Sequence, residues 1–185
     1  MSLKTTVTAF AAAALVTLSA ATGAFAAGDS ADVTVKVSSP SNAALSASIE
    51  SGSFQEVQYR AGNSFQNSNG SLTVYANDPR GTGSGWTVSL KGSGAFTSAE
   101  NNTFPLEKFS LQTGSVQGVS GETINGISSR EVNSLSTNPQ AIMVAQQKAG
   151  LGQFKDTISA VVQVPDGTLV GQYKTTLTVS IVAGQ

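Results

Sequence analysis

The sequence predicts an all-β fold, an antiparallel β-sandwich with one short helix. Apolar and polar residues alternate over several short runs of the 185-residue chain, which is the pattern of strands with one buried face. Glycine, proline, asparagine and serine separate these runs and provide many turns. Short strands at such spacing favour a sandwich over β-α-β units.

Residues 1–26 are predicted to be a signal peptide that lies outside the fold. Lys4 precedes an alanine-rich apolar run over residues 7–18, and Ala24-Phe25-Ala26 offers small residues for cleavage. The apolar run is shorter than the roughly 20 residues that cross a bilayer. The sequence therefore predicts an exported protein with a single domain over residues 27–185 and no membrane span after cleavage.

Alternating residues predict strands along the whole of this domain. Residues 61–71 are polar and rich in asparagine and glycine, so they predict a loop, and residues 114–138 allow one or two short strands on an edge. Pro165-Asp166-Gly167 predicts a turn between the last two strands. The predicted strands are 33–37, 45–49, 54–59, 72–76, 86–90, 104–112, 154–164 and 173–181.

A glycine-rich segment, residues 77–85, leads into the only tryptophan of the chain. Asp78-Pro79 ends the preceding strand, because proline has no N–H for a ladder. Glycines at every second position follow and favour a tight turn, since glycine adopts positive φ at little steric cost. The sequence predicts a hairpin with Trp86 at its base, and Trp86, Val88 and Leu90 on one face of the new strand.

One helix is predicted over residues 139–149. Asn138 and Pro139 suit an N-cap and the first helical position. Helix-forming residues follow, and Gly150 is a typical C-terminal signal.

The composition excludes several classes of function. The chain has no cysteine and no histidine, so it lacks the usual zinc ligands, a thiol nucleophile and a histidine base. The glycine run lacks the Gly-Lys-Ser/Thr ending of a phosphate loop. A glycosidase needs two carboxylates close together, whereas the acidic residues here are scattered singly along the chain. Removing Lys4 from the ten basic residues leaves nine against eleven acidic ones, a net charge of −2 that argues against nucleic-acid binding. We expect no enzyme activity, no cofactor and no metal.

Three stretches of the sequence resemble the WxL-domain family, envelope proteins of Gram-positive bacteria. The stretches are residues 77–88 (NDPRGTGSGWTV), residues 145–152 (AQQKAGLG), and residues 164–167 (VPDG) continuing into 171–181 (GQYKTTLTVSI). The resemblance implies an all-β domain held non-covalently at the cell surface by peptidoglycan, another wall polymer or envelope proteins. The family is named for two Trp-x-Leu motifs, which here have become Trp86-Thr87-Val88 and Val179-Ser180-Ile181.

Two interpretations of the tryptophan positions remain open at this point. As a binding residue, Trp86 would stack on a sugar ring; as a core residue, it would cover the glycine turn, and its parity with Val88 and Leu90 favours the core. Val179 likewise shares the parity of Leu177 and Ile181, which favours packing over a lost binding surface. The candidate binding residues are Trp86, Asp78, Arg80 and Tyr173, with a local ion pair between Asp78 and Arg80 as the plainer alternative.

Two other non-catalytic functions are compatible with the sequence. The ending around residues 171–179 loosely resembles the last strand of pilin-like subunits, which assemble by strand donation. A carbohydrate-binding module unrelated to the wall is a further alternative.

Overall fold

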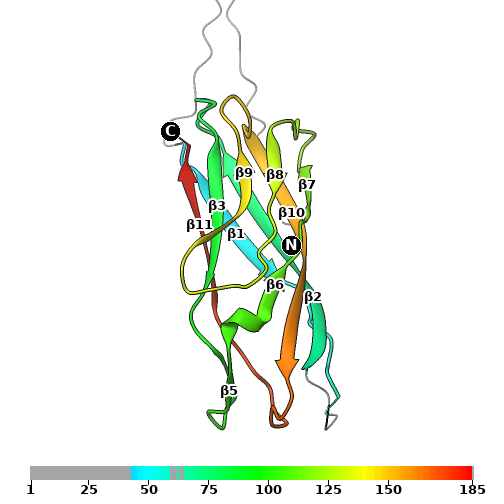
Figure 1. Ribbon diagram of the computed structural model, residues 1–185. Coiled ribbons are helices and arrows are strands. Elements are labelled where there is room, and N and C mark those ends of the chain that lie inside the picture. Colours follow the sequence, from blue (N-terminus) through cyan, green and yellow to red (C-terminus); the bar gives the residue numbers. More distant parts are fainter. Residues whose placement is uncertain (1–42, 59–61, 63–64, 185) are drawn as a thin grey trace, which may run out of the picture. The chain divides into compact units, whose positions relative to one another are not determined.

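The computed structural model describes residues 43–58, 62 and 65–184 (Figure 1). The predicted signal peptide and the predicted strand at 33–37 lie outside these residues. The described chain forms antiparallel sheets, which confirms the predicted β-sandwich class.

Two sheets carry most of the strands. The first has the order β1 (Ser46–Ser51), β2 (Phe65–Asp78), β10 (Gly152–Pro165) and β6 (Phe109–Leu111), with β7 (Ser115–Gly118) also on β10. The second has the order β11 (Leu177–Ala183), β3 (Trp86–Gly92), β9 (Gln140–Ala145) and β8 (Ile127–Ser129). A small ladder joins β4 (Phe96–Thr97) to β5 (Thr103–Phe104), and a 3-10 turn, η1, spans Leu106–Lys108.

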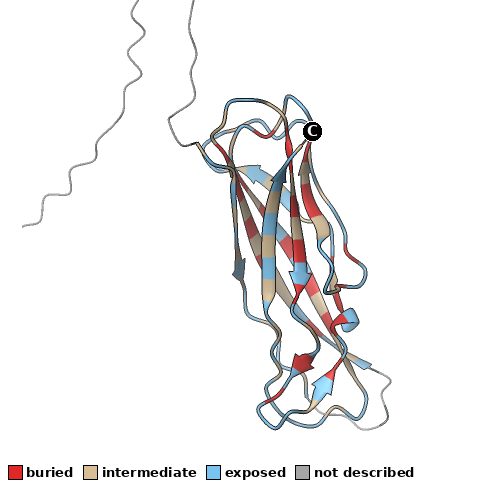
Figure 2. Cartoon of the chain, turned by 90° about the vertical axis from the view of Figure 1, so that its left-hand side faces the viewer, coloured by how far each residue is buried: buried red, intermediate tan, exposed pale blue. Residues whose placement is uncertain are grey.

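The core lies between the two sheets and follows the alternation of the sequence. On β3, Trp86, Val88 and Leu90 are buried and the residues between them are not, as predicted. On the other sheet, Leu72 and Phe154 belong to the same hydrophobic cluster. Bands of buried and exposed residues alternate along the strands in Figure 2. The inward rows therefore supply most of the apolar burial that stabilises the domain.

The predicted hairpin at the glycine-rich segment is wrong. Strand β2 pairs with β1 and β10, whereas β3 pairs with β11 and β9, so the segment between them crosses from one sheet to the other. The last two strands, β10 and β11, are likewise divided between the two sheets. The turn at residues 165–167 forms, but β10 and β11 belong to different sheets.

The predicted helix over residues 139–149 is also wrong, because residues 140–145 form strand β9. The register with β3 shifts between Val88 and Ser89, so that Val88 faces Met143 while Ser89 faces Ala141. The extra residue of this bulge, Ile142, is buried together with Met143. Two adjacent buried residues break the period of two, and this irregularity removed the strand signal from the sequence.

The predicted loop over residues 61–71 is largely a strand. Residues 65–71 belong to β2 and pair with β10 over the whole of that length, from Phe65 opposite Pro165 to Ser71 opposite Ser159. The composition of this part is polar, but its backbone gains a full ladder from a long partner strand. Tertiary pairing therefore overrides local propensity here.

Candidate functional site

Trp86 lies in the core at the end of the sandwich where β3 begins. None of its surface is exposed, and its indole N–H donates a hydrogen bond to the carbonyl oxygen of Gly150 over 2.8 Å. The ring is tilted against Phe154 with their centroids 6.0 Å apart. Both faces and the polar atom of Trp86 are therefore engaged within the protein, and no ligand can stack on it in this conformation.

Two glycines make room for this arrangement. Gly85 has φ of 69°, and a side chain there would come within 2.5 Å of the carbonyl oxygen of Ala145. Gly150 has φ of 78°, and a side chain there would come within 2.5 Å of the Trp86 indole nitrogen. Both positions combine a left-handed backbone with close approach, which only glycine tolerates without strain.

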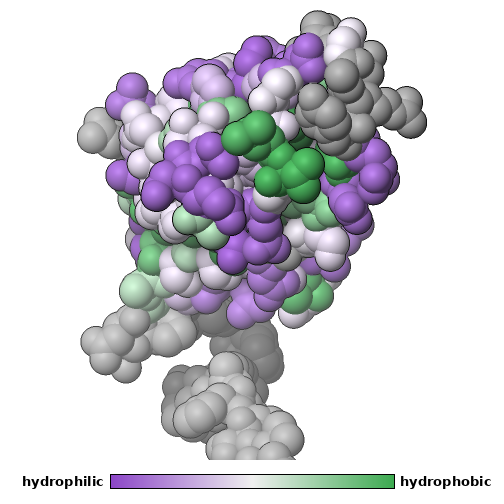
Figure 3. Space-filling model, turned by 90° about the horizontal axis from the view of Figure 1, so that it is seen from below, coloured by the Kyte–Doolittle hydropathy of each residue, from purple (hydrophilic) through white to green (hydrophobic). Residues whose placement is uncertain are grey.

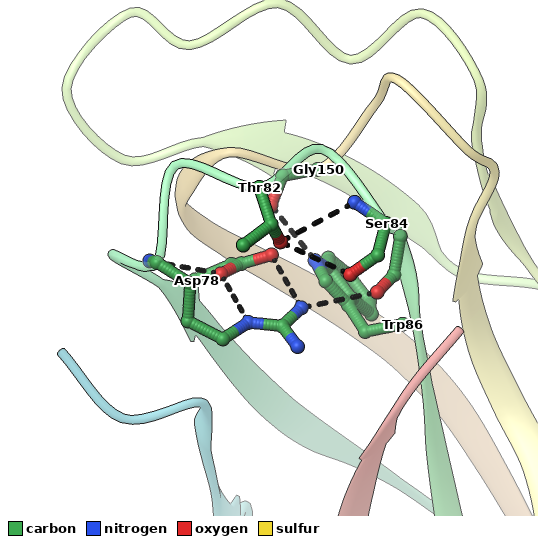
Figure 4. Close-up of polar contacts among 7 residues, drawn as sticks. Asp78, Thr82, Ser84, Trp86 and Gly150 are labelled. Atoms are coloured by element: carbon green, nitrogen blue, oxygen red, sulfur yellow. Dashed lines mark hydrogen bonds and ion pairs between the residues drawn. The ribbon is translucent and has the colours of Figure 1, made fainter. Parts of the chain in front are cut away.

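Asp78 and Arg80 form an ion pair beside Trp86 (Figure 4). The carboxylate of Asp78 is fully buried and accepts two hydrogen bonds from the guanidinium, each 2.8 Å long. Arg80 also donates to the carbonyl oxygen of Gly85 over 3.1 Å. The pair thus joins the end of β2 to the start of β3, and its planar, two-bond geometry fixes the crossing segment.

The ion pair changes the acidity of Asp78. Burial by itself raises the pKa of this carboxyl, but the hydrogen bonds and the charge of Arg80 outweigh burial and hold the pKa below its usual value. Asp78 is therefore ionised at neutral pH, and both of its carboxylate oxygens are hydrogen-bonded to Arg80.

The first two stretches that carry the family resemblance meet around Trp86, and the end of the third stretch joins them. The backbone N–H of Lys148 donates to the carbonyl oxygen of Gly83 over 2.6 Å, which ties the loop after β9 to the glycine-rich segment. Strand β11 from the third stretch pairs with β3, and Val179 lies opposite Leu90. Val179 is half-buried and packs against the core, as the packing interpretation requires. These contacts make this end a closed, internally bonded unit.

Tyr173 lies apart from the other three candidates, beside the turn after β10. Its hydroxyl donates to the carbonyl oxygen of Leu169 over 2.9 Å, and its ring centroid is 5.1 Å from that of Phe104. The structure thus brings Trp86, Asp78 and Arg80 together, whereas Tyr173 lies away from them, against Leu169 and Phe104.

A groove with a volume of about 1170 Å³ opens next to Tyr173. One wall is the segment after β1 and the other is the segment between β10 and β11; residues that line the groove include Phe54, Gln55, Gln66, Leu169, Val170 and Gln172. Phe65, Leu169 and Val170 are exposed by 50%, 61% and 85% of their surface. Figure 3 looks onto this end and shows an apolar patch among hydrophilic residues.

Of the residues that line this groove, only Tyr173 is among the binding candidates from the sequence, although one further signal was present. Leu169 and Val170 come one residue after the Pro-Asp-Gly turn, at a place where polar residues are the rule. Two adjacent aliphatic residues in a turn have no core to enter, so they indicate a surface that contacts something else.

A second buried carboxylate, that of Asp156, lies on β10, away from both Trp86 and the groove beside Tyr173. Asp156 is fully buried, and neither of its oxygens makes a hydrogen bond with another described residue. Burial raises its pKa, and the neighbouring Ser129 hydroxyl opposes this only in part. The Ser129 hydroxyl instead accepts a hydrogen bond from the backbone N–H of Gly114 over 2.8 Å.

Two further kinds of feature, a metal-binding cluster and a membrane-spanning helix, are absent from the described part of the chain. Over these residues there is no group of three or more acidic, histidine or cysteine side chains that could hold a metal ion. The same residues include no helix long and apolar enough to cross a membrane.

Comparison with known proteins gives one clear result. No curated protein matches the sequence. Residues 34–183 match the model of a family described as the WxL domain, a surface domain that binds the cell wall. Since the match covers most of the chain and includes both the end that holds Trp86 and the groove, the protein belongs to the WxL family of surface cell-wall-binding domains.

Proposed function

We propose that the chain is a non-catalytic, exported domain that binds peptidoglycan non-covalently through the groove beside Tyr173. The observation that supports this choice is the contrast in exposure between the two candidate places. Trp86 has no exposed surface, whereas Val170 exposes 85% of its surface beside a groove. A wall polymer needs an accessible surface, and the groove offers one.

The chemistry of the groove suits a glycan. Aromatic and aliphatic side chains such as Phe54 and Leu169 can pack on the C–H faces of sugar rings. The amides of Gln55, Gln66 and Gln172 can donate to and accept from hydroxyl and N-acetyl groups. This combination of apolar area and a few polar groups is typical of ligand sites.

The charges around the groove favour a glycan without phosphates. Among the described residues, its charged lining residues are Glu56, Asp166 and Lys174, so the acidic groups described there outnumber the basic ones. A polymer with phosphodiesters in its backbone, such as teichoic acid, requires a basic surface, because its binding depends on the neutralisation of phosphates. We therefore assign the groove to the sugar strands of peptidoglycan.

Co-sedimentation with insoluble Gram-positive peptidoglycan tests this function. We expect the wild-type chain to pellet, and Val170→Asp to bind roughly tenfold more weakly, because it places a charge where an apolar side chain contacts the sugar. Leu151→Asp is the matched control, since Leu151 is 44% exposed and does not line the groove. Circular dichroism verifies that each variant is folded.

Two results would contradict the proposal in different ways. A folded wild-type chain that stays in the supernatant means that attachment to the wall does not occur through peptidoglycan. If the wild type pellets and both aspartate variants pellet equally well, the groove is not the binding site.

A further inference from the structure

Strand β11 bonds to β3 along one edge, and its other edge bonds to no residue in the described part of the chain. The N–H of Ser93 donates to the carbonyl oxygen of Thr176, and the N–H of Gly184 donates to that of Gly85. Alternate residues of an antiparallel ladder direct their backbone groups to opposite edges, so the even-numbered residues of β11 bond to β3. The residues that direct their N–H and C=O groups to the open edge are Leu177, Val179, Ile181 and Ala183.

The outer strands of the two large sheets differ in how well their edges are protected. Strands β6, β7 and β8 have only three, four and three residues. Strand β1 has six residues and carries Glu50. Strand β11 has seven residues with no charge and no proline, and Val182 on it is 60% exposed. Natural edge strands are normally short, charged or interrupted by proline, so β11 is unusually suited to strand addition.

We propose that β11 pairs with β11 of a second copy of this chain, antiparallel, about a two-fold axis at Ser180. Because the odd-numbered residues face the open edge, bonded pairs must join odd residues to odd residues. The register that pairs all seven residues obeys this rule and sets Val179 opposite Ile181 of the second copy. Leu177 then lies opposite Ala183 of the second copy, and Ser180 faces its own equivalent.

The second copy is the occupant because the edge is complementary to itself. Each of the four bonded pairs exchanges two N–H···O bonds, which gives about eight backbone hydrogen bonds across the axis. A strand without charged residues places no like charges opposite each other, whereas self-pairing of β1 would bring in Glu50 from both copies. A two-fold contact also closes on itself and does not continue into a fibre.

The dimer has a consequence that rests on the proposed function. Antiparallel strands point in opposite directions, so the segments that precede β11 in the two copies lie at opposite ends of the joined sheet. Those segments form one wall of each groove. The dimer therefore presents its two grooves in opposite directions and joins two separate glycan strands.

Sedimentation velocity of the chain without any wall material tests the dimer independently of wall binding. We expect the wild type to dimerise reversibly and Ser180→Lys to dimerise at least about tenfold more weakly, because the axis sets the two lysines side by side. Ser48→Lys is the matched control, since Ser48 is an exposed serine on the other long edge strand, β1. We expect this control to dimerise like the wild type.

A cysteine at the axis provides a second, positive test. The chain has no cysteine, so Ser180→Cys introduces a unique thiol. Facing residues of a non-bonded pair lie close enough for a disulfide after small adjustments, so we expect a covalent dimer under mild oxidation. Ser48→Cys serves as the control and should remain uncoupled.

Three results would overturn the proposal. The first is a wild type that remains monomeric at all accessible concentrations. The second is a dimer that is equally sensitive, or equally insensitive, to lysine at positions 180 and 48. The third is a monomer in which the amides of Val179 and Ile181 resist hydrogen exchange, which would mean that another part of the same chain covers the edge.

Discussion

The two ends of the sandwich are built in opposite ways. At the end that holds Trp86, an ion pair, two tight glycines and several hydrogen bonds fill the space between the sheets. At the end that holds Tyr173, a groove remains open and aliphatic side chains face outward. Two of the stretches that identify the family surround Trp86 and maintain the fold, whereas the third, residues 164–167 and 171–181, supplies one wall of the groove as well as part of β11. A recognisable motif therefore indicates the family directly, but only its exposure in the structure shows whether it can also bind a ligand.

The largest expected effect is loss of stability on Trp86→Ala. Removal of a fully buried ring and its hydrogen bond should lower the free energy of unfolding by about 3–5 kcal/mol, a large part of the stability of a typical domain. Urea denaturation monitored by circular dichroism measures this change. Trp86→Phe retains a ring but leaves the Gly150 carbonyl unpaired, and should cost about 1–3 kcal/mol. A loss below about 1 kcal/mol for Trp86→Ala would show that the Trp86 end is not the stabilising unit.

Asp78→Asn should destabilise the same end by a smaller and pH-dependent amount. The variant removes the charge from the buried pair with Arg80, at a cost of about 1–3 kcal/mol at pH 7. The folded-state pKa of Asp78 is lowered, so its contribution is present above the unfolded value and disappears as the pH falls through the folded value. Urea denaturation at pH 7 and pH 3 measures this. The difference between variant and wild type should shrink at the lower pH, and a constant difference would contradict the ion-pair account. Asp166→Asn is the control, since Asp166 is an exposed turn residue.

Asp156→Asn should change the stability in the opposite direction and make the folded state more stable. The folded-state pKa of Asp156 is raised by burial, so the wild type loses stability as the pH rises from the unfolded value through the folded value. An uncharged amide avoids this loss and should stabilise the protein by about 1–3 kcal/mol at pH 7. Thermal denaturation between pH 3 and pH 8 is a suitable measurement. The advantage of the variant should vanish at the acidic limit, and an advantage that is independent of pH would reject the explanation by charge.

The smallest effect is expected for Tyr173→Phe at the open end. The substitution removes one hydrogen bond, from a half-buried residue to the carbonyl oxygen of Leu169, and should cost about 0.5 kcal/mol. Urea denaturation compared directly with Trp86→Phe measures the contrast between the two ends. Equal losses of stability for the two variants would mean that these side-chain hydrogen bonds stabilise both ends to the same degree.

The sequence predicted the layers better than the connections between them. Trp86, Val88 and Leu90 were placed on one buried face because alternation reports directly on burial. The crossing after Asp78 was misinterpreted as a hairpin, because a glycine-rich turn specifies a tight backbone but not the sheet that the next strand joins. Strand β9 was misinterpreted as a helix because a bulge at Ile142 broke its alternation.

The candidate site was predictable only in part. The pairing of Asp78 with Arg80 followed from their spacing, and the structure contains it. The groove could not be derived, because its walls are irregular segments whose positions depend on the ends of strands far apart in the sequence. Local patterns carry no information about where such segments meet.

The opposite locations of the groove and of Ala183 also determine how the domain responds to a pull. Strand β11 runs from the groove wall at Leu177 to Ala183 near the Trp86 end (Figure 1). A force applied between a wall strand in the groove and the chain beyond Ala183 acts along the axis of β11. The part of this force that enters through the other wall, the segment after β1, reaches Ala183 only across the contacts of β11 with the rest of the domain, and the hydrogen bonds of β11 to β3 are then loaded in shear together. Such a geometry resists mechanical unfolding far better than one in which the bonds open one after another.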